Sequence, residues 1–385
     1  MSATTAFTGA RIFDGARWHD RSALLVRDGL VVGLMAADSP SDARRVALAG
    51  GLLVPGFVDL QVNGGGGALL NETQSVDAIR AICSAHARFG TTALLPTLIT
   101  DTTEVTARAV AAGIAAAEAG VPGFLGLHLE GPHLSVARKG AHDPALIRPM
   151  DDADLDALRA ARARLPSLLT TVAAETVTPR QVAALVEAGI VVSIGHSDAP
   201  FKTVTAAASA GATMITHLFN AMSQLGNREA GVVGAALAGG SLYAGLIADG
   251  IHVDPAVIAI ALRAKQGPAK IFLVTDAMSI TGTDLTTITL NGRAISRSGG
   301  ALRLADGTLA GADLTMIEAV LVMQRKVGVA LEETLRMAAL YPAEAMGVSS
   351  RHGHLRQGAV ASFVHLSDDL AVKGTWIDGV RVFAA

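Results

Sequence analysis

Apolar runs of strand length alternate with alanine-rich stretches of helix length through most of the 385-residue chain. The uncharged run Thr91–Ile99, for example, is followed by the helix-like stretch Thr102–Ala119. Strands buried on both faces read as near-continuous apolar runs, and their alternation with helices is typical of a parallel sheet. We predict eight such strands: Leu52–Val62, Thr91–Ile99, Gly123–Glu130, Leu168–Glu175, Val191–His196, Met214–Phe219, Tyr243–Asp249 and Lys270–Asp276.

Helices are predicted between these strands, and the clearest are Ser75–Phe89, Thr102–Ala119, Pro179–Ala188 and Pro255–Lys265. Eight strand–helix units that close on themselves form a (β/α)₈ barrel of the TIM type. The pattern therefore predicts an α/β protein built around such a barrel. In this fold the functional side chains lie at the C-terminal ends of the strands.

The two ends of the chain are predicted to be β-structure outside the barrel. The N-terminal part contains short strand-like pieces and the turn Arg27-Asp28-Gly29, and the C-terminal part contains the turn Asp378-Gly379. We expect both ends to form one small β-sandwich, from residues 1–52 and 348–385, beside a barrel of residues 53–347. The strand-like pieces are Ala6–Phe13, Ser22–Arg27, Leu30–Leu34, Gly358–Leu366 and Val372–Val380.

Composition and charge exclude several classes of protein. A net charge of -3 argues against a nucleic-acid surface or a polybasic membrane patch. Half of the residues are hydrophobic, but no uninterrupted run of roughly 20 apolar residues appears, so we expect no membrane span. The lone Cys83 excludes an internal disulfide, and Met1–Arg17 shows no signal-peptide pattern. A cytoplasmic location is therefore expected.

Polar side chains gather at the predicted strand ends. Two imidazoles and a carboxylate from different strands form a good ligand set for Zn²⁺ or a similar divalent ion, and three protein ligands leave room for a water. A lone histidine at a strand end is more often a hydrogen-bonded structural residue, but His196 and His217 both lie at such ends. His128 shares a strand face with Glu130, and we favour a role in which it contacts the metal ligands over one in which it is itself a ligand. The strand-end residues are Gln61, Asn63, Glu130, Glu175, His196, His217, Asp249 and Asp276.

Five segments in register resemble the N-acetylglucosamine-6-phosphate deacetylases of the amidohydrolase superfamily. The resemblance runs from Pro55-Gly-Phe-Val-Asp59 to Gly358 and so covers essentially the whole chain. It implies a (β/α)₈ barrel with a small β-sandwich built from both termini. The segments are His128-Leu-Glu130-Gly-Pro132, Ser193-Ile-Gly-His196-Ser, Thr216-His217-Leu-Phe-Asn220-Ala221-Met222, Ala248-Asp249-Gly-Ile-His252 and Leu273-Val-Thr-Asp276-Ala.

The resemblance also implies roles for individual residues. Glu130, His196 and His217 correspond to the metal ligands, and Asp276 corresponds to the catalytic acid and base. One divalent cation per chain is implied, with Zn²⁺ as the first expectation and Fe²⁺, Co²⁺ and Mn²⁺ as alternatives. A homodimer is implied as well, in which Arg228 could be supplied across the interface. The positions that match phosphosugar-binding residues are Ala141, His142, Asn220, Ala221, Arg228, Asp249, His252, Leu309, Ala310 and Gly311.

One departure from the wider superfamily concerns the first strand. Many amidohydrolases carry His-x-His there and bind a second metal, whereas this chain has Gln61-Val-Asn63. Amides are poor Zn²⁺ ligands beside imidazoles, so we expect this second-metal position to be vestigial.

The expected reaction is the metal-dependent hydrolysis of the acetamide of N-acetylglucosamine 6-phosphate, which yields glucosamine 6-phosphate and acetate in amino-sugar catabolism. One alternative is a related amidohydrolase that acts on a cyclic amide or on N-acetylgalactosamine 6-phosphate. Another is a non-catalytic scaffold of the same fold, but such a protein should have lost Glu130, one histidine or Asp276, and all are present. A phosphate-binding isomerase barrel would need no metal-ligand set.

Overall fold

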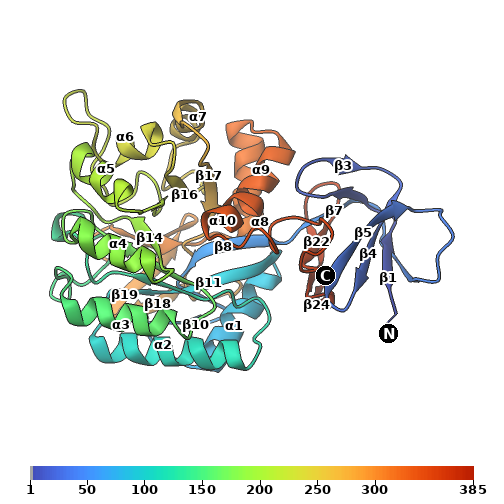
Figure 1. Cartoon of the computed structure of the whole chain (residues 1–385), viewed down its shortest axis with the longest axis horizontal. Coiled ribbons are helices and arrows are strands. Elements are labelled where there is room, and N and C mark those ends of the chain that lie inside the picture. The colour runs from blue at the N-terminus through green and yellow to red at the C-terminus, as the bar shows by residue number, and fades with distance from the viewer. Residues whose placement is uncertain (1–2) are drawn as a thin grey trace.

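A parallel eight-stranded sheet forms the centre of the computed structural model, which describes residues 3–385 (Figure 1). Its strands follow one another in chain order, and the two outermost, β8 and β17, meet through a parallel bridge between Val62 and Ala277. This arrangement confirms the predicted (β/α)₈ barrel. The strands are β8 (Phe57–Val62), β11 (Thr91–Ile99), β12 (Leu127–Glu130), β13 (Leu168–Val172), β14 (Val191–Ile194), β15 (Met214–Ile215), β16 (Tyr243–Ile247) and β17 (Ile271–Val274).

Helices cover the outside of the barrel and begin where capping residues predict. Ser75 accepts a hydrogen bond from the backbone of Ala78, and Thr178 forms a reciprocal capping box with Gln181 ahead of Pro179. The helices are α1 (Val76–Ala87), α2 (Thr103–Glu118), α3 (Asp152–Arg162), α4 (Pro179–Glu187), α5 (Phe201–Ser209), α6 (Gly231–Ala238), α7 (Pro255–Ala264), α8 (Met316–Val322), α9 (Leu331–Ala338) and α10 (Leu340–Ala345), with a 3₁₀ turn at Val136–Arg138 and a π turn at Met323–Val327.

Both ends of the chain meet in two sheets beside the barrel, at the right of Figure 1. Phe7 from the N-terminal part packs edge-on against Phe363 and Trp376 from the C-terminal part, so one core joins the two ends. The expected β-structure of both termini is confirmed. The first sheet contains β5 (Leu30–Ala36), β4 (Ser22–Arg27), β1 (Thr5–Thr8) and β6 (Arg44–Ala47); the second contains β24 (Val380–Ala384), β23 (Val372–Ile377), β22 (Phe363–Leu366), β7 (Leu52–Pro55), β2 (Arg11–Phe13) and β3 (Trp18–His19).

The boundary drawn after residue 52 falls inside β7, which pairs with β2 and β22 in the terminal sheet. The predicted strand Leu52–Val62 is therefore two strands with different partners, separated at Gly56. A side chain at Gly56 would overlap Thr92, so the chain passes from one sheet to the other where no side chain fits. The division into residues 1–52, 53–347 and 348–385 stays a prediction.

An antiparallel sheet between β17 and α8 was not predicted from the sequence. Its apolar face packs over the barrel end, where Ile295 and Leu302 share a buried cluster with Leu69 and Met278. A short hairpin, β9 (Gly64–Gly65) with β10 (Ala68–Leu69), contributes Leu69 to the same cluster. The added sheet consists of β18 (Thr287–Leu290), β19 (Arg293–Ser298), β20 (Ala301–Arg303) and β21 (Leu309–Ala312).

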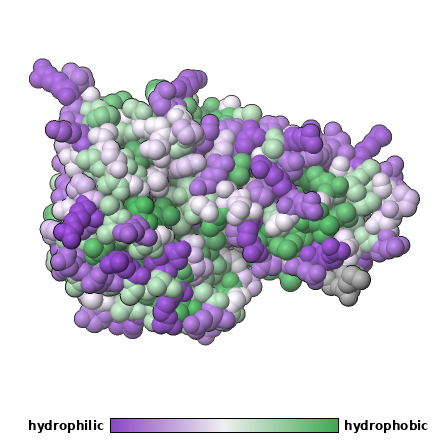
Figure 2. All heavy atoms as spheres, in the orientation of Figure 1, coloured by the Kyte–Doolittle hydropathy of each residue, from purple (hydrophilic) through white to green (hydrophobic). Residues whose placement is uncertain are grey.

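The helices and the surface were compared with the expectation that the chain does not span a membrane. Within residues 3–385, no helix combines the length and the apolar character that a membrane crossing requires. Hydrophilic side chains are spread over the face in Figure 2, with only scattered apolar patches between them. Cys83 is a buried residue of α1.

Candidate active site

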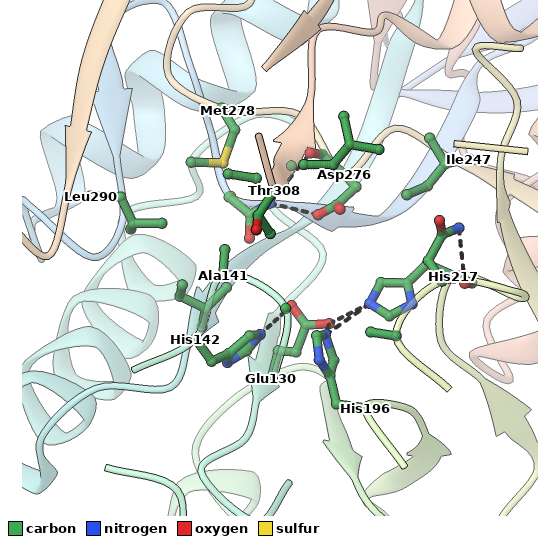
Figure 3. A pocket seen from close by; sticks show the side chains of 18 of the residues that line it. Glu130, Ala141, His142, His196, His217, Ile247, Asp276, Met278, Leu290 and Thr308 are labelled. Carbon is green, nitrogen blue, oxygen red and sulfur yellow. Dashed lines mark hydrogen bonds and ion pairs between the residues drawn. The ribbon is translucent and has the colours of Figure 1, made fainter. Parts of the chain in front are cut away.

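Glu130, His196 and His217 converge at the C-terminal end of the barrel (Figure 3). Glu130 is the last residue of β12, and each histidine lies two residues beyond the end of its strand. Glu130 Oε1 lies 3.3 Å from His196 Nε2 and 3.1 Å from His217 Nε2, and the two imidazole nitrogens are 3.0 Å apart. Three strands therefore bring three potential metal ligands to one point.

The backbone turns sharply where the strands end, and this turn aims the side chains inward. His196, His217 and Asp276 all adopt positive φ angles, of 47°, 30° and 53°. Residues other than glycine rarely take this conformation, and it concentrates at functional sites where the surrounding structure holds it. The predicted strands Val191–His196, Met214–Phe219 and Lys270–Asp276 are correspondingly shorter in the structure, because the ladder ends before these residues.

The three residues fit a divalent cation. Their side chains are nearly inaccessible, with residue exposures of 2% for Glu130, 5% for His196 and 4% for His217. Two imidazole nitrogens and a carboxylate oxygen match the donor set of catalytic zinc sites. His142 joins them as a further histidine, because one ligand atom each of Glu130, His142 and His196 lies within 4.8 Å of the others. The site can therefore hold a metal ion, and the choice among these ligands stays a prediction.

Electrostatic interactions keep Glu130 ionised. Burial alone would raise its pKa, but hydrogen bonds from His196 and His217 outweigh burial and hold the pKa of Glu130 well below its usual range. Burial likewise lowers the pKa of His217, yet its hydrogen bond to Glu130 raises that pKa above the ordinary histidine value. The pKa of His142 is lowered, chiefly by burial and then by His196, so this imidazole is neutral near pH 7.

Asp276 faces this cluster from the eighth strand (Figure 3). Its Oδ1 accepts a hydrogen bond of 2.7 Å from Asn63 Nδ2. Burial, followed by the nearby charge of Glu130, raises the pKa of Asp276 to about 6. A carboxyl group whose pKa lies close to neutrality is suited to both accepting and donating a proton.

Gln61 and Asn63, the residues expected at the vestigial metal position, each contact one of the site's carboxylates. Gln61 Nε2 donates a hydrogen bond to Glu130 Oε1 over 3.1 Å, and Asn63 contacts Asp276 as described. Many amidohydrolases carry His-x-His at these two positions. Here the two side-chain amides donate hydrogen bonds to acidic side chains instead. His128 Nε2 lies 2.7 Å from Thr171 Oγ1, and the supporting role of His128 stays a prediction.

A pocket of about 350 Å³ opens over these side chains. Asp249 does not line it but lies behind the pocket residue His252, whose Nδ1 is 2.6 Å from Asp249 Oδ2. Glu175 also lies outside the pocket, where it accepts hydrogen bonds from Ser197 and Asp198. The substrate-binding positions expected from the sequence that do line the pocket are Ala141, His142, Asn220, Ala221, His252, Leu309, Ala310 and Gly311.

Arg228, like Asp249, is an expected substrate residue that does not line the pocket. It is exposed on residues 223–230, in a loop that projects beside α5 and α6 at the upper left of Figure 1. Leu225 of the same loop is 59% exposed. Within residues 3–385, Arg228 is not among the residues that form the pocket walls.

The structure adds pocket residues that were not identified from the sequence. Arg138, Met278, Leu290 and Thr308 line the cavity, and the Arg293 guanidinium on β19 donates to the Ala141 carbonyl. The alternation of apolar and polar residues in Thr287–Leu290 and Arg293–Ser298 was a usable β signal. Their contact with residues about 150 positions earlier carried no local signal.

Comparison with known proteins identifies the family. Residues 52–382 match the amidohydrolase family, and the chain belongs to it. It is 41% identical over 380 residues to an N-acetylgalactosamine-6-phosphate deacetylase of Shewanella sp. (strain ANA-3), covering 98% of this chain and 95% of that protein. It is 35% identical to the human N-acetylglucosamine-6-phosphate deacetylase, at 98% and 95% coverage.

A solved structure of N-acetylglucosamine-6-phosphate deacetylase from Pasteurella multocida superposes with a TM-score of 0.95 at 36% identity, covering 99% of this chain and all of that one. A mutant of the Mycobacterium smegmatis deacetylase, solved with N-acetyl-D-glucosamine-6-phosphate, gives a TM-score of 0.89 at 31% identity and 99% coverage of both chains. The resemblance inferred from the sequence motifs is thus confirmed.

Proposed function

We propose that this protein is a metal-dependent deacetylase that hydrolyses the acetamide of N-acetylglucosamine 6-phosphate to glucosamine 6-phosphate and acetate, in amino-sugar catabolism. The observation that carries the proposal is the convergence of Glu130, His196 and His217 opposite Asp276 at the base of one pocket. The names of the relatives from humans and Pasteurella multocida support the same substrate.

The 4-epimer, N-acetylgalactosamine 6-phosphate, is the alternative substrate. The Shewanella relative, at 41% identity, carries that name. The two sugars differ only in the orientation of one hydroxyl group, whereas the amide and the phosphate are common to both. The two candidates therefore share the chemistry described below, and only a direct comparison of rates separates them.

Glu130, His196 and His217 would hold one divalent cation, for which the donor set favours Zn²⁺, with Fe²⁺, Co²⁺ and Mn²⁺ as alternatives. When bound, such a cation acidifies a coordinated water and polarises a carbonyl group. Gln61 and Asn63 offer amide donors where a second cation would need ligands. We therefore expect one ion per chain.

Asp276 is positioned to accept a proton from the attacking water and to deliver it to the departing nitrogen. Its pKa of about 6 leaves it mostly ionised at neutral pH and still able to carry the proton transiently. Asn63 keeps the carboxylate oriented through its hydrogen bond to Oδ1. The neutral His142, with Nε2 3.9 Å from Glu130 Oε2, can donate a hydrogen bond to the carbonyl oxygen as negative charge develops there.

The phosphate would be bound by His252 and Arg228. Asp249 orients His252 through a 2.6 Å contact between Asp249 Oδ2 and His252 Nδ1, which leaves Nε2 of the ring to contact an anion. Because Arg228 is exposed on a projecting loop, we propose that the enzyme is a homodimer in which each chain supplies Arg228 to the other's pocket. We also propose a cytoplasmic location, which the single buried Cys83 supports.

An acetate-release assay on four sugars tests the proposal: N-acetylglucosamine and N-acetylgalactosamine, each with and without the 6-phosphate. We expect the highest kcat/KM on N-acetylglucosamine 6-phosphate, and metal analysis of the same sample should return one ion per chain. Higher kcat/KM on the galacto epimer would reassign the substrate. Two ions per chain, both required for activity, would refute the single-metal site.

A further inference from the structure

A small cavity lies inside the barrel beneath the proposed metal site. Its volume is about 10 Å³, and its walls come from β8, β12, β13, β16 and β17 together with residues 214–217. Most of the wall is apolar, but four residues carry polar side chains: Gln61, His128, Thr216 and His217. The cavity therefore combines the room for about one water molecule with polar groups that could bind it.

His217, one of the residues that line this cavity, has a buried ring nitrogen for which residues 3–385 provide no partner. Its Nε2 lies 3.1 Å from Glu130 Oε1 on the pocket side of the ring. Its Nδ1 is buried, and within residues 3–385 nothing forms a hydrogen bond with it. His196 differs, because its Nδ1 lies 2.7 Å from the Arg138 carbonyl oxygen. Histidines that bind metals almost always donate their second ring N–H to a carboxylate, a carbonyl or a water.

We infer that the cavity binds one internal water molecule, which accepts a hydrogen bond from His217 Nδ1–H. The water holds the tautomer in which the Nε2 lone pair faces the cation. This inference rests on the metal-binding role proposed for His217. The water would play for His217 Nδ1 the part that the Arg138 carbonyl oxygen plays for His196 Nδ1.

Hydroxyl groups beside the cavity extend this connection. Thr216 Oγ1 lies 2.7 Å from Thr171 Oγ1 and 2.6 Å from Ser193 Oγ. Thr171 Oγ1 is in turn 2.7 Å from His128 Nε2. A water in the cavity would therefore have the Thr216 hydroxyl beside it as well as His217, and Thr216 belongs to a chain of hydrogen-bonded side chains within the barrel. A buried water requires two to four polar partners.

Gly245→Ala is designed to fill the cavity without removing any polar group. A Cβ at this position would lie 3.3 Å from Val274 Cγ1 and 3.5 Å from Phe272 Cε2, and both side chains belong to the cavity wall. We expect Zn²⁺ affinity to fall by about 10- to 100-fold, the usual effect of losing a partner behind a metal ligand. Competition with a chromophoric chelator on metal-stripped protein measures this without any activity assay.

Phe272→Leu is the matched control. It alters the same wall and weakens packing, but it enlarges the cavity and leaves room for the water. Zn²⁺ affinity should therefore stay close to that of the parent, although the variant is less stable. Equal losses of Zn²⁺ affinity in the two variants would show that packing beneath the site matters rather than the water.

High-resolution crystal structures of the metal-free and Zn²⁺-loaded parent decide the matter directly. We expect one ordered density peak within about 3.2 Å of His217 Nδ1. A cavity without density would overturn the inference, whatever the variants do and even if Gly245→Ala fails to fold. A parent that shows the peak but binds no Zn²⁺ would refute the metal role of His217 while keeping the water site, so the two failures are distinguishable.

Discussion

The two halves of the pocket are built in different ways. On the metal side, Glu130, His196 and His217 are at most 5% exposed and lie within 3.3 Å of a neighbour. On the side that we propose binds phosphate, His252 lines the pocket, but Arg228 is exposed on a loop. One chain thus holds the candidate bond-breaking groups together, whereas Arg228, which we propose binds the phosphosugar, does not line the pocket of its own chain.

The burial of the metal side has a physical reason. Hydrogen bonds to charged groups strengthen away from water, so buried groups that pair well stay in one geometry. An arginine exposed on a loop keeps its side-chain entropy until a partner or a ligand orders it. Four experiments test whether this contrast holds.

Asp276→Asn should show the largest effect, a fall in kcat of about 10²- to 10⁴-fold. The amide is nearly isosteric but cannot carry a proton at neutral pH. Because Asp276 is not among the proposed ligands, metal content should be unchanged in elemental analysis of the same preparation. A kcat within a few-fold of the parent would assign the proton transfer to another group.

Asp59→Asn tests how the barrel supports Asp276. Asp59 is fully buried beneath the site and accepts hydrogen bonds from Thr275 Oγ1 over 2.6 Å and from the Thr275 backbone over 3.2 Å, across the closure between β8 and β17. Burial raises the pKa of Asp59 to about 7. The folded protein therefore keeps a proton that the unfolded chain loses near pH 4.

This stabilising contribution is complete below about pH 4 and is lost as the pH rises through about 7. The parent should lose stability relative to Asp59→Asn over that window, by a total on the order of 4 kcal/mol. Urea unfolding of both metal-free proteins at a series of pH values measures the difference. A difference that does not change with pH would mean that Asp59 stays ionised in the folded state.

Arg228→Ala should lower kcat/KM for the phosphosugar by about 10- to 100-fold, because a charge-assisted hydrogen bond contributes roughly 1.5–3 kcal/mol. Activity on unphosphorylated N-acetylglucosamine should barely change, since that sugar lacks the group that Arg228 would bind. Arg180→Ala, at an exposed position on α4, is the matched control. Equal losses on both sugars would give Arg228 a role in the fold or the dimer instead.

Mixing the Arg228→Ala and Asp276→Asn proteins should give the smallest change in activity, but this change tests specifically whether Arg228 acts across a dimer interface. If Arg228 acts across a dimer interface, half of the randomised dimers are mixed, and each mixed dimer has one complete site. Activity should then rise to about a quarter of the parent value after subunit exchange. If Arg228 serves its own chain, no mixed dimer contains a complete site, and kcat/KM stays at the mean of the two variants.

The sequence by itself determined the barrel and the positions of its chemistry. Apolar runs such as Thr91–Ile99, which alternate with stretches of helix length, predict strands buried on both faces, and the polar residues that follow such strands lie at one end of the barrel. Glu130, His196, His217 and Asp276 were among the eight polar residues placed at strand ends in this way, and the family resemblance then implied the roles of these four.

Other features depend on contacts between distant segments, and only the tertiary structure decided them. The sheet β18–β21 forms one wall of the pocket, and Arg293 reaches Ala141 about 150 residues earlier. Gln61 and Asn63 donate hydrogen bonds to Glu130 and Asp276, and a cavity lies beside His217. Local patterns specify which elements form and which face is buried. Hydrogen-bond partners and cavities depend on how side chains from several strands pack together, and no local pattern records that packing.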